Sequence, residues 1–177
     1  KTNLVIGQSG SGKTVFLKCL LGLHVIDSGE IIYDGKSSYE MNDFDKLNLR
    51  RDMGMVFQGS ALFDSMNVLE NVRFPLDMLT NFEKEEKEEK ALKFIKRVNL
   101  EDAINKLPAE LSGGMQKRVA IARAVVMNPK YLFCDEPNSG LDPKTAIVID
   151  KLIQAITNEF QITTVINSHD MNSVIEI

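Results

Sequence analysis

Residues 7 to 14 read GQSGSGKT, and the architecture of this chain of 177 residues can be worked out from that loop. The loop fits the pattern G-x-x-x-x-G-K-[ST]. Glycines allow the backbone to wrap closely around phosphate oxygens, and the N–H groups at the start of a following helix favour an anion. We therefore predict a phosphate-binding loop made of Gly7, Gln8, Ser9, Gly10, Ser11, Gly12, Lys13 and Thr14.

The flanking segments give this loop the context that the motif requires. Thr2 to Ile6 form a short apolar strand before it, and residues 15–23 are expected to continue as a buried helix. In such a loop the Lys13 ammonium reaches the β- and γ-phosphates of a nucleoside triphosphate, and the Thr14 hydroxyl coordinates Mg²⁺. ATP and Mg²⁺ are therefore the expected ligands.

Strands alternate with helices along most of the chain. Short apolar runs predict further strands at residues 28–35, 53–57, 131–135 and 162–168. Residues 36–50 are polar and give no distinct pattern, whereas Pro143 suits the first position of a helix. The alternation indicates an α/β fold with a mostly parallel sheet, as in RecA-like P-loop nucleoside triphosphatases.

A long helical pattern between residues 61 and 111 interrupts this alternation and predicts an inserted helical lobe. The charge run at residues 81–90 is interpreted as the solvated face of one of its helices. We expect a single domain over residues 1–177, with a core at 1–60 and 118–177 and the lobe at about 61–117.

Polar side chains follow three of the predicted strands, at the ends where a parallel sheet binds ligands. Asp135 and Glu136 close the apolar run YLFCD, and Gln58 and His169 each follow another strand. Asp135 is expected to serve the Mg²⁺ shell, together with Thr14. Glu136 is expected to act as the general base for the water that attacks the γ-phosphate.

The stretch LSGGMQKR, residues 111–118, raises a separate question. Ser112 suits a helix N-cap, but the adjacent Gly113 and Gly114 in the first turn reduce helix stability. Free N–H groups there make a second anion site, although one ATP has a single γ-phosphate. The consistent solution is that this helix caps the nucleotide of another copy, in a head-to-tail dimer with two ATP molecules between the chains.

Composition limits the other partners. The formal net charge of -4 gives no sign of a nucleic-acid surface, so no nucleic acid is expected as a partner. No apolar run approaches the roughly 20 residues that span a bilayer. Cys19 and Cys134 are interpreted as buried thiols rather than metal ligands. If the protein moves a cargo across a membrane, another subunit forms the path.

Six motifs in this order resemble the ATPase domains of ABC proteins: the phosphate loop, the Gln58 loop, LSGGMQKR, YLFCDEP, SGLD and SHD. The resemblance covers nearly the whole chain. It implies that the signature residues contact the ATP held by the partner chain, and these are Ser112, Gly113, Gly114 and Met115.

The same resemblance assigns roles to three further side chains. Asp142 would lie at the dimer seam, although as an N-cap before Pro143 it also has a plain structural role. His169 would contact the γ-phosphate and stabilise charge as water attacks. Gln58 would join Mg²⁺ and the water to the lobe that contacts a membrane partner.

The chain departs from the family pattern in a few places. Met115 replaces the commoner Gln, and Asn138 replaces the usual Thr of EPTSGLD, but neither change removes a catalytic group. The family stacks adenine on an aromatic residue upstream of the phosphate loop, and this sequence starts after that position. Because the sequence begins inside a predicted strand and ends inside a predicted helix, we expect a fragment of a longer protein.

Two longer stretches of sequence indicate which kind of ABC protein the chain resembles. Residues 50–76 and 111–124 resemble the ATPases of Mla-type lipid-asymmetry systems. That resemblance implies an integral membrane permease, an MCE-type lipid-binding protein and phospholipid as cargo, with this subunit in the cytoplasm on the inner face of the cell membrane. Apolar residues that would line the permease groove, or else only pack between the lobes, are Ala61, Leu62, Phe63 and Met66.

Two alternatives remain open. An importer of amino acids or other small solutes uses an ATPase with the same catalytic motifs. A DNA-repair or regulatory ABC ATPase has no membrane partner, but such proteins usually carry a long coiled-coil insertion. The segment between Gln58 and Ser112 is short and shows no sustained heptads, which favours a transporter.

Overall fold

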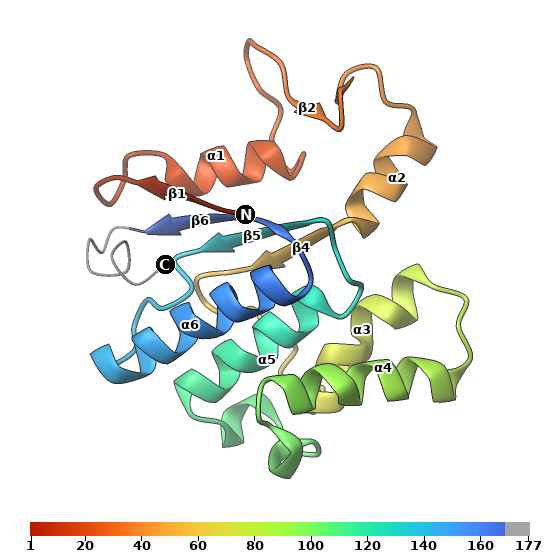
Figure 1. The fold of residues 1–177 in the computed structure, drawn as a ribbon, viewed down its shortest axis with the longest axis vertical. Coiled ribbons are helices and arrows are strands. Elements are labelled where there is room, and N and C mark those ends of the chain that lie inside the picture. Colours follow the sequence, from red (N-terminus) through yellow and green to blue (C-terminus); the bar gives the residue numbers. More distant parts are fainter. Residues whose placement is uncertain (169–177) are drawn as a thin grey trace.

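A parallel sheet forms the centre of the computed structural model, which describes residues 1–168 (Figure 1). Its strands lie in the order β1 (Thr2–Ile6), β6 (Thr163–Ser168), β5 (Tyr131–Asp135) and β4 (Met53–Val56). Each neighbouring pair is parallel. The carboxyl ends of the strands therefore meet at one edge, as the sequence predicts.

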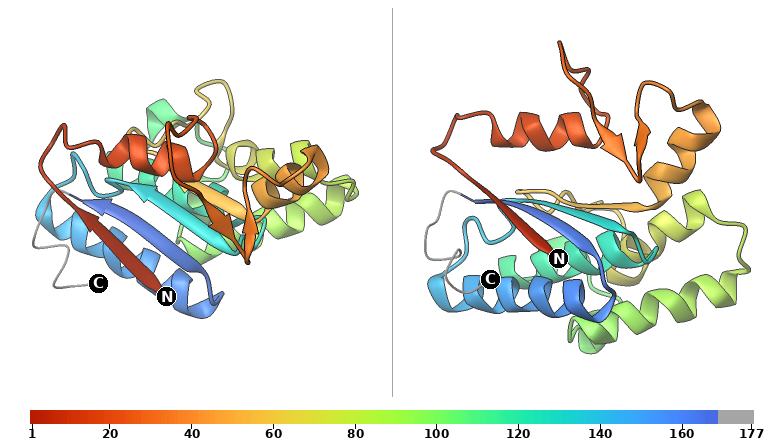
Figure 2. Two further views of the ribbon diagram at one scale, coloured as in Figure 1. Left: turned by 90° about the horizontal axis from the view of Figure 1, so that it is seen from above. Right: turned by 45° about the horizontal axis from the view of Figure 1, so that its top comes forward.

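Helices cover both faces of this sheet (Figures 1 and 2). Helix α1 (Lys13–Leu20) lies over one face, and α5 (Gly113–Val125) and α6 (Pro143–Glu159) lie over the other. The expected α/β architecture is confirmed. Only one side of α1 is buried, however, since Val15 and Phe16 are about half exposed. The expectation of a buried helix holds for Leu17 but not for the rest of its length.

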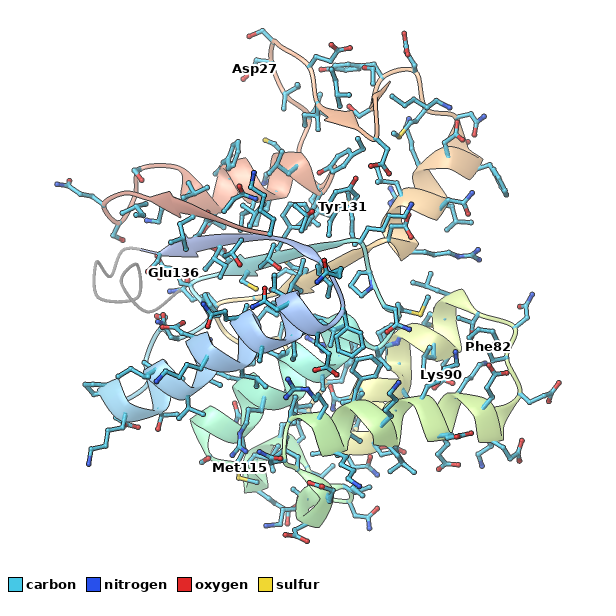
Figure 3. The ribbon with its side chains drawn as sticks, in the orientation of Figure 1. Asp27, Phe82, Lys90, Met115, Tyr131 and Glu136 are labelled. Carbon is cyan, nitrogen blue, oxygen red and sulfur yellow. The ribbon has the colours of Figure 1, made fainter. Side chains whose placement is uncertain are left out.

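The helical lobe consists of α3 (Val68–Leu79) and α4 (Lys84–Arg97), followed by two short 3₁₀ turns, η1 (Glu101–Ala103) and η2 (Pro108–Glu110). Both long helices pack against α5 (Figure 1). The charge run belongs to α4, where Lys90 pairs with Glu86 and also lies over the Phe82 ring (Figure 3).

The segment between α1 and β4 differs from the sequence-based expectation. The predicted strand at 28–35 reduces to a small ribbon of β2 (Ile32–Tyr33) and β3 (Lys36–Ser37). Asp34 and Gly35 turn the chain with positive φ values of 51° and 80°, as in a tight hairpin. The two strands pair only with each other and lie apart from the main sheet (Figure 2).

A helix that the sequence pattern left unassigned follows the ribbon. Helix α2 (Asp43–Arg51) begins at a capping box in which the side chains of Asn42 and Asp45 each accept a hydrogen bond from the other's backbone N–H. The signal is present in the sequence as Asn followed three positions later by Asp. The usual residue at that position is Glu or Gln, so the sequence does not match the common form of the capping box.

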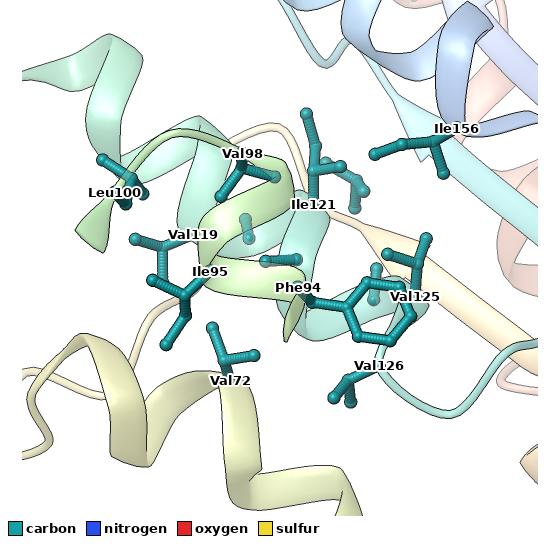
Figure 4. Close-up of a cluster of buried hydrophobic side chains, with 14 of the residues drawn as sticks. Val72, Phe94, Ile95, Val98, Leu100, Val119, Ile121, Val125, Val126 and Ile156 are labelled. Carbon is teal, nitrogen blue, oxygen red and sulfur yellow. The ribbon is translucent and has the colours of Figure 1, made fainter. Parts of the chain in front are cut away.

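One hydrophobic cluster runs without a break from the sheet into the helical lobe (Figure 4). It joins Val56 on β4 and Ile153 on α6 to Ile121 on α5 and then to Val72 and Ile95 in the lobe. Helix α5 belongs to both layers. The expected boundary between residues 117 and 118 therefore falls inside a single helix.

Gly54 explains how α5 approaches the sheet so closely. A Cβ atom at this position would lie 2.2 Å from the carbonyl oxygen of Ala124 on α5. That contact is with backbone and cannot be relieved by a side-chain rotation. The glycine in the predicted strand MGMVF is thus required by helix-to-sheet packing.

Candidate functional site

The predicted phosphate loop connects β1 to α1, at the carboxyl edge of the sheet. Gly10 and Gly12 have φ values of 81° and 92°, a region that glycine adopts without strain. The Lys13 ammonium folds back over the loop and donates hydrogen bonds to the carbonyl oxygens of Gly7, at 2.8 Å, and Gln8, at 3.0 Å. Two hydrogen bonds to the loop's own carbonyl oxygens therefore fix the position of this ammonium.

Behind the loop lies a buried polar group centred on Asp135. Its Oδ1 accepts hydrogen bonds from the Thr14 hydroxyl at 3.0 Å and from Asn167 Nδ2 at 3.2 Å. Asp135 and Asn167 are paired in register on β5 and β6. The predicted Thr14 and Asp135 are thus brought together, whereas Asn167 was not anticipated from the sequence.

These residues fit the donor set that Mg²⁺ prefers. A hydroxyl and a carboxylate supply hard oxygen atoms, and Mg²⁺ usually keeps several waters and binds substrate phosphates as well. In residues 1–168 no group of three His, Cys, Asp or Glu side chains could form a dedicated metal cage. The Thr14 hydroxyl and the Asp135 carboxylate suit an ion that completes its shell with waters and substrate phosphates.

Glu136 follows directly at the end of β5 and lies next to the phosphate loop (Figure 3). Its Oε1 lies 3.7 Å from Lys13 Nζ. Its Oε2 accepts a hydrogen bond from Gln58 Nε2 at 3.0 Å, and Gln58 also donates to Ser139 Oγ at 3.4 Å. Two predicted residues from separate strands are thereby joined. The third, His169, lies outside the described residues.

The backbone at Glu136 is unusual, with a φ of 45° in the left-handed region. Its N–H donates to the carbonyl oxygen of Asn167 at 3.1 Å, and its carbonyl oxygen accepts from the Ser139 N–H at 3.1 Å. Both bonds hold the strained turn. A non-glycine residue in this conformation is typical of functional sites, where the surrounding structure fixes it.

Lys117 is a second residue that the sequence interpretation did not single out. It lies on α5, is 5% exposed, and donates a hydrogen bond from Nζ to the carbonyl oxygen of Gln58. Burial lowers the pKa of this lysine, and the charge of nearby Glu136 partly opposes that effect. The residue lies within the quoted LSGGMQKR motif, but nothing in the motif itself assigns it a contact.

The signature residues begin α5, as expected. Ser112 is the N-cap, and its Oγ accepts a hydrogen bond from the Met115 N–H at 3.3 Å. Figure 3 shows Met115 well away from Glu136. Within one chain the structure therefore does not bring the signature turn to the phosphate loop.

The two glycines of the signature differ in their surroundings. A Cβ on Gly114 would lie 2.7 Å from Thr145 Cγ2 on α6, so packing between the helices explains this glycine. A Cβ on Gly113 would meet only Leu141 Cδ2, at 3.5 Å, which is ordinary contact. Nothing within the described part of the chain requires Gly113 to be glycine.

Asp142 lines the same hollow as the signature turn, a space of about 540 Å³. Its Oδ1 accepts hydrogen bonds from the N–H groups of Lys144 and Thr145, both at 3.1 Å. Hydrogen bonding from Thr145 lowers the pKa of the Asp142 carboxyl. The predicted N-cap role before Pro143 is confirmed, and the dimer-seam role stays a prediction.

A second hollow of about 240 Å³ lies between β4, α3 and α5. Four apolar residues were expected either to line a groove or to pack between the lobes. Ala61 and Phe63 line this hollow, Leu62 packs against the main core, and Met66 is not part of the lining. Arg123 on α5 holds the adjoining loop by donating to the carbonyl oxygens of Ala61, at 2.7 Å, and Ser60, at 2.8 Å. Burial lowers the pKa of this guanidinium.

Comparison with known proteins agrees with this geometry. Residues 1–139 match the family described as ABC transporter. The chain is 45% identical over 175 residues to the methionine import ATP-binding protein MetN of Clostridium tetani, which covers 98% of this chain and 54% of that protein. It is 38% identical to the probable ribonucleotide transport ATP-binding protein mkl of Mycobacterium leprae, over 97% of this chain and 48% of that protein.

Solved structures give the same fold. The dimeric post-hydrolysis state of the ATP-binding cassette MJ0796, bound to ADP and Pi, has a TM-score of 0.85 and 35% identity, and covers 99% of this chain and 77% of that one. For cbiO1 of Clostridium perfringens, part of the cbiONQ transporter complex, the TM-score is 0.87 at 32% identity, covering 98% of this chain and 69% of that one.

Two further facts about the chain accompany these comparisons. The chain spans about half the length of the curated relatives that it matches. Among residues 1–168, no helix combines the length and the apolar character needed to cross a bilayer.

Proposed function

The chain belongs to the ABC transporter family, and on that premise we propose that it binds and hydrolyses ATP with Mg²⁺ to power a transporter. The observation that carries this proposal is the meeting of Lys13, Gln58 and Glu136 at one sheet edge, although they come from three separate segments. The ADP and Pi bound to the similar MJ0796 cassette support hydrolysis as the reaction.

The residues divide the chemistry among them. Lys13 and the loop N–H groups would bind the phosphates, and Thr14 and Asp135 would hold Mg²⁺, with Asp135 acting through water. Bound Mg²⁺ would neutralise charge on the phosphates. Glu136 accepts a proton from the attacking water, Gln58 positions that water beside it, and His169 stabilises the charge that develops on the γ-phosphate.

The second half of the proposal is a head-to-tail homodimer. The signature turn, from Ser112 to Met115, lies away from its own phosphate loop and is free to face the ATP of a partner copy, with Asp142 at the seam. Each ATP then contacts both chains, so ATP binding favours the closed state and hydrolysis releases it. The similarity to a dimeric cassette supports this arrangement.

We further propose that a membrane permease docks at the hollow between β4, α3 and α5. Phe63 is partly exposed there and its ring contacts Phe74 at a centroid distance of 4.5 Å, which leaves apolar surface for a partner. The same loop begins at Gln58, so a permease at this hollow is directly linked to the catalytic edge. On this proposal the subunit would lie in the cytoplasm, on the inner face of the cell membrane.

For the cargo, we propose an amino acid of the methionine class. The support is the 45% identity to a protein named for methionine import, over nearly the whole of this chain. Phospholipid, with an MCE-type partner, is the second candidate and rests on the resemblance of residues 50–76 and 111–124 to Mla-type ATPases. The relatives described above, one of them named for ribonucleotide transport, add nothing to the phospholipid candidate.

The deciding experiment is purification of the complete subunit from its native membrane in mild detergent, with mass spectrometry of the co-purifying proteins and lipids. A permease with a receptor for a soluble amino acid supports the import proposal. A permease with an MCE-type protein and bound phospholipid supports the lipid alternative. ATP hydrolysis stimulated by DNA, with no membrane protein recovered, would overturn the transporter assignment itself.

A further inference from the structure

Asn167 is a polar residue at a buried position of a strand in the central sheet. It lies near the end of β6 and is fully buried, at 0% exposure. Its Nδ2 donates to Asp135 Oδ1 at 3.2 Å, but its Oδ1 has no hydrogen-bond partner. Among the described residues this is the one buried side-chain polar atom without a partner.

A buried amide oxygen without a hydrogen-bond partner is unfavourable, because it has lost its bonds to water and gained none in return. Such an atom calls for a donor that the bare chain lacks, such as a water or the hydration shell of an ion. The Oδ1 and Nδ2 atoms of Asn167 belong to the same small planar amide group. The oxygen therefore lies within one amide width of the nitrogen that contacts Asp135.

The residues around Asn167 indicate what kind of donor its Oδ1 atom would accept a hydrogen bond from. Asp135 Oδ1 is already engaged by Thr14 and by Asn167, so the rest of the carboxylate remains for the ion's water shell. Metal sites in proteins commonly depend on outer residues that orient the direct ligands in this way.

We propose that Asn167 is a positioning residue of the Mg²⁺ site. Its amide nitrogen fixes the Asp135 carboxylate, and its amide oxygen accepts a hydrogen bond from a water of the ion's hydration shell. The inference rests on the proposed ATPase function, which supplies the ion and the nucleotide. Asn167 touches neither the nucleotide nor the reacting atoms and is not a catalytic residue.

The test measures how strongly Mg²⁺ and nucleotide binding are coupled, without using turnover. A fluorescent, non-hydrolysable ATP analogue is titrated into the complete subunit, once with saturating Mg²⁺ and once with EDTA. The ratio of the two Kd values is the coupling between ion and nucleotide. For Asn167→Val we expect this ratio to fall about tenfold, with the Kd in EDTA unchanged.

Matched variants separate polar contact from packing. Asn167→Thr has nearly the shape of the valine variant but keeps a hydroxyl, and should recover part of the coupling. Thr164→Val removes a buried hydroxyl that bonds Thr157 across the opposite face of β6, and should leave the coupling as in wild type. Thermal melts verify folding, and Asn167→Ala with Asn167→Ser replaces the branched pair if that pair does not fold.

The outcomes are distinct. Wild-type coupling in Asn167→Val, or an equal loss in the valine and threonine variants, overturns the role of Asn167 and leaves the ATPase proposal intact. If the wild-type protein shows no effect of Mg²⁺ on nucleotide binding, the proposed function fails and this inference fails with it.

Discussion

Gln58 donates a hydrogen bond from Nε2 to Oε2 of Glu136 at 3.0 Å, although 78 positions separate the two residues in the chain. The bond joins the end of β4 to the end of β5. Because the Gln58 loop also borders the hollow proposed for a membrane partner, a displacement there reaches the carboxylate through a single side chain.

The first prediction concerns Glu136→Gln. An amide of the same shape cannot accept a proton from water, so turnover should fall by about 10²–10⁴. ATP binding should persist, and ATP-bound dimer should accumulate because the closed state is no longer released by hydrolysis. Phosphate release and size-exclusion chromatography with ATP measure the two effects. Wild-type turnover in this variant would contradict the assignment of the base.

The second prediction concerns the link between Lys117 and Gln58. In Lys117→Met the Gln58 carbonyl loses its donor, so the loop is held less firmly beside Glu136. We expect kcat to fall by about ten- to a hundredfold through misplacement of the water, with little change in KM for ATP. Lys84→Met, at the exposed start of α4, is the control. A change in KM alone would show that Lys117 acts on nucleotide binding instead.

The same lysine predicts a dependence of stability on pH. Burial lowers the pKa of Lys117 below its ordinary value of 10.5, so the folded chain releases this proton at a lower pH than the unfolded chain. As pH rises through the interval just below 10.5, the free energy of unfolding of the wild type should therefore rise relative to Lys117→Met. Urea denaturation of both proteins across that interval checks the sign, and parallel curves would contradict it.

The third site for mutation is Gly54, where α5 meets the sheet. In Gly54→Ala the new methyl group meets the Ala124 carbonyl. We expect the free energy of unfolding to fall by about 1–3 kcal/mol or more. Gly59→Ala is the matched control, because a Cβ there has nothing within 4 Å. Chemical denaturation measures both, and equal stability of the two variants would refute the packing argument.

The signature glycines should separate folding from dimer formation. Gly114→Ala should lower the melting temperature because its methyl group meets Thr145, and adding Thr145→Ser, which removes Cγ2, should restore it. Gly113→Ala should not lower the melting temperature, because its methyl group meets only an ordinary contact and alanine favours a helix over glycine. It should weaken ATP-driven dimerisation, measured in a Glu136→Gln background. Dimerisation at the wild-type level in Gly113→Ala would argue against a role for this glycine at the partner's ATP.

The sequence was most informative where one short segment carries the whole signal. The strand Tyr131–Asp135 and the Ser112 N-cap were located to the residue, because apolar runs and capping residues act over a few positions. The ribbon near residue 34 was harder, since isoleucines favour a strand whether or not a neighbour is available to pair with it.

The supporting residues of the site could not be found in this way. Asn167 contacts Asp135 across 32 positions, and Lys117 contacts Gln58 across 59. Asn167 belongs to no recognisable local pattern, and the LSGGMQKR motif that contains Lys117 assigns this lysine no contact. A buried lysine or asparagine on an apolar segment looks like an exception rather than a signal. Only the assembled sheet shows which strand ends become neighbours.

The way helix α5 is anchored has a consequence for how movement passes through the protein. Its 13 residues span about 20 Å, with Ser112 at one end and, near the other, Arg123 holding the loop at Ser60. Between them, Lys117 is tied to Gln58, and the helix is packed on both sides by one continuous core. A helix anchored in this way does not tilt at one end alone. In the proposed complex, a change at the partner's nucleotide would therefore be passed along α5 to the loop beside the proposed permease hollow.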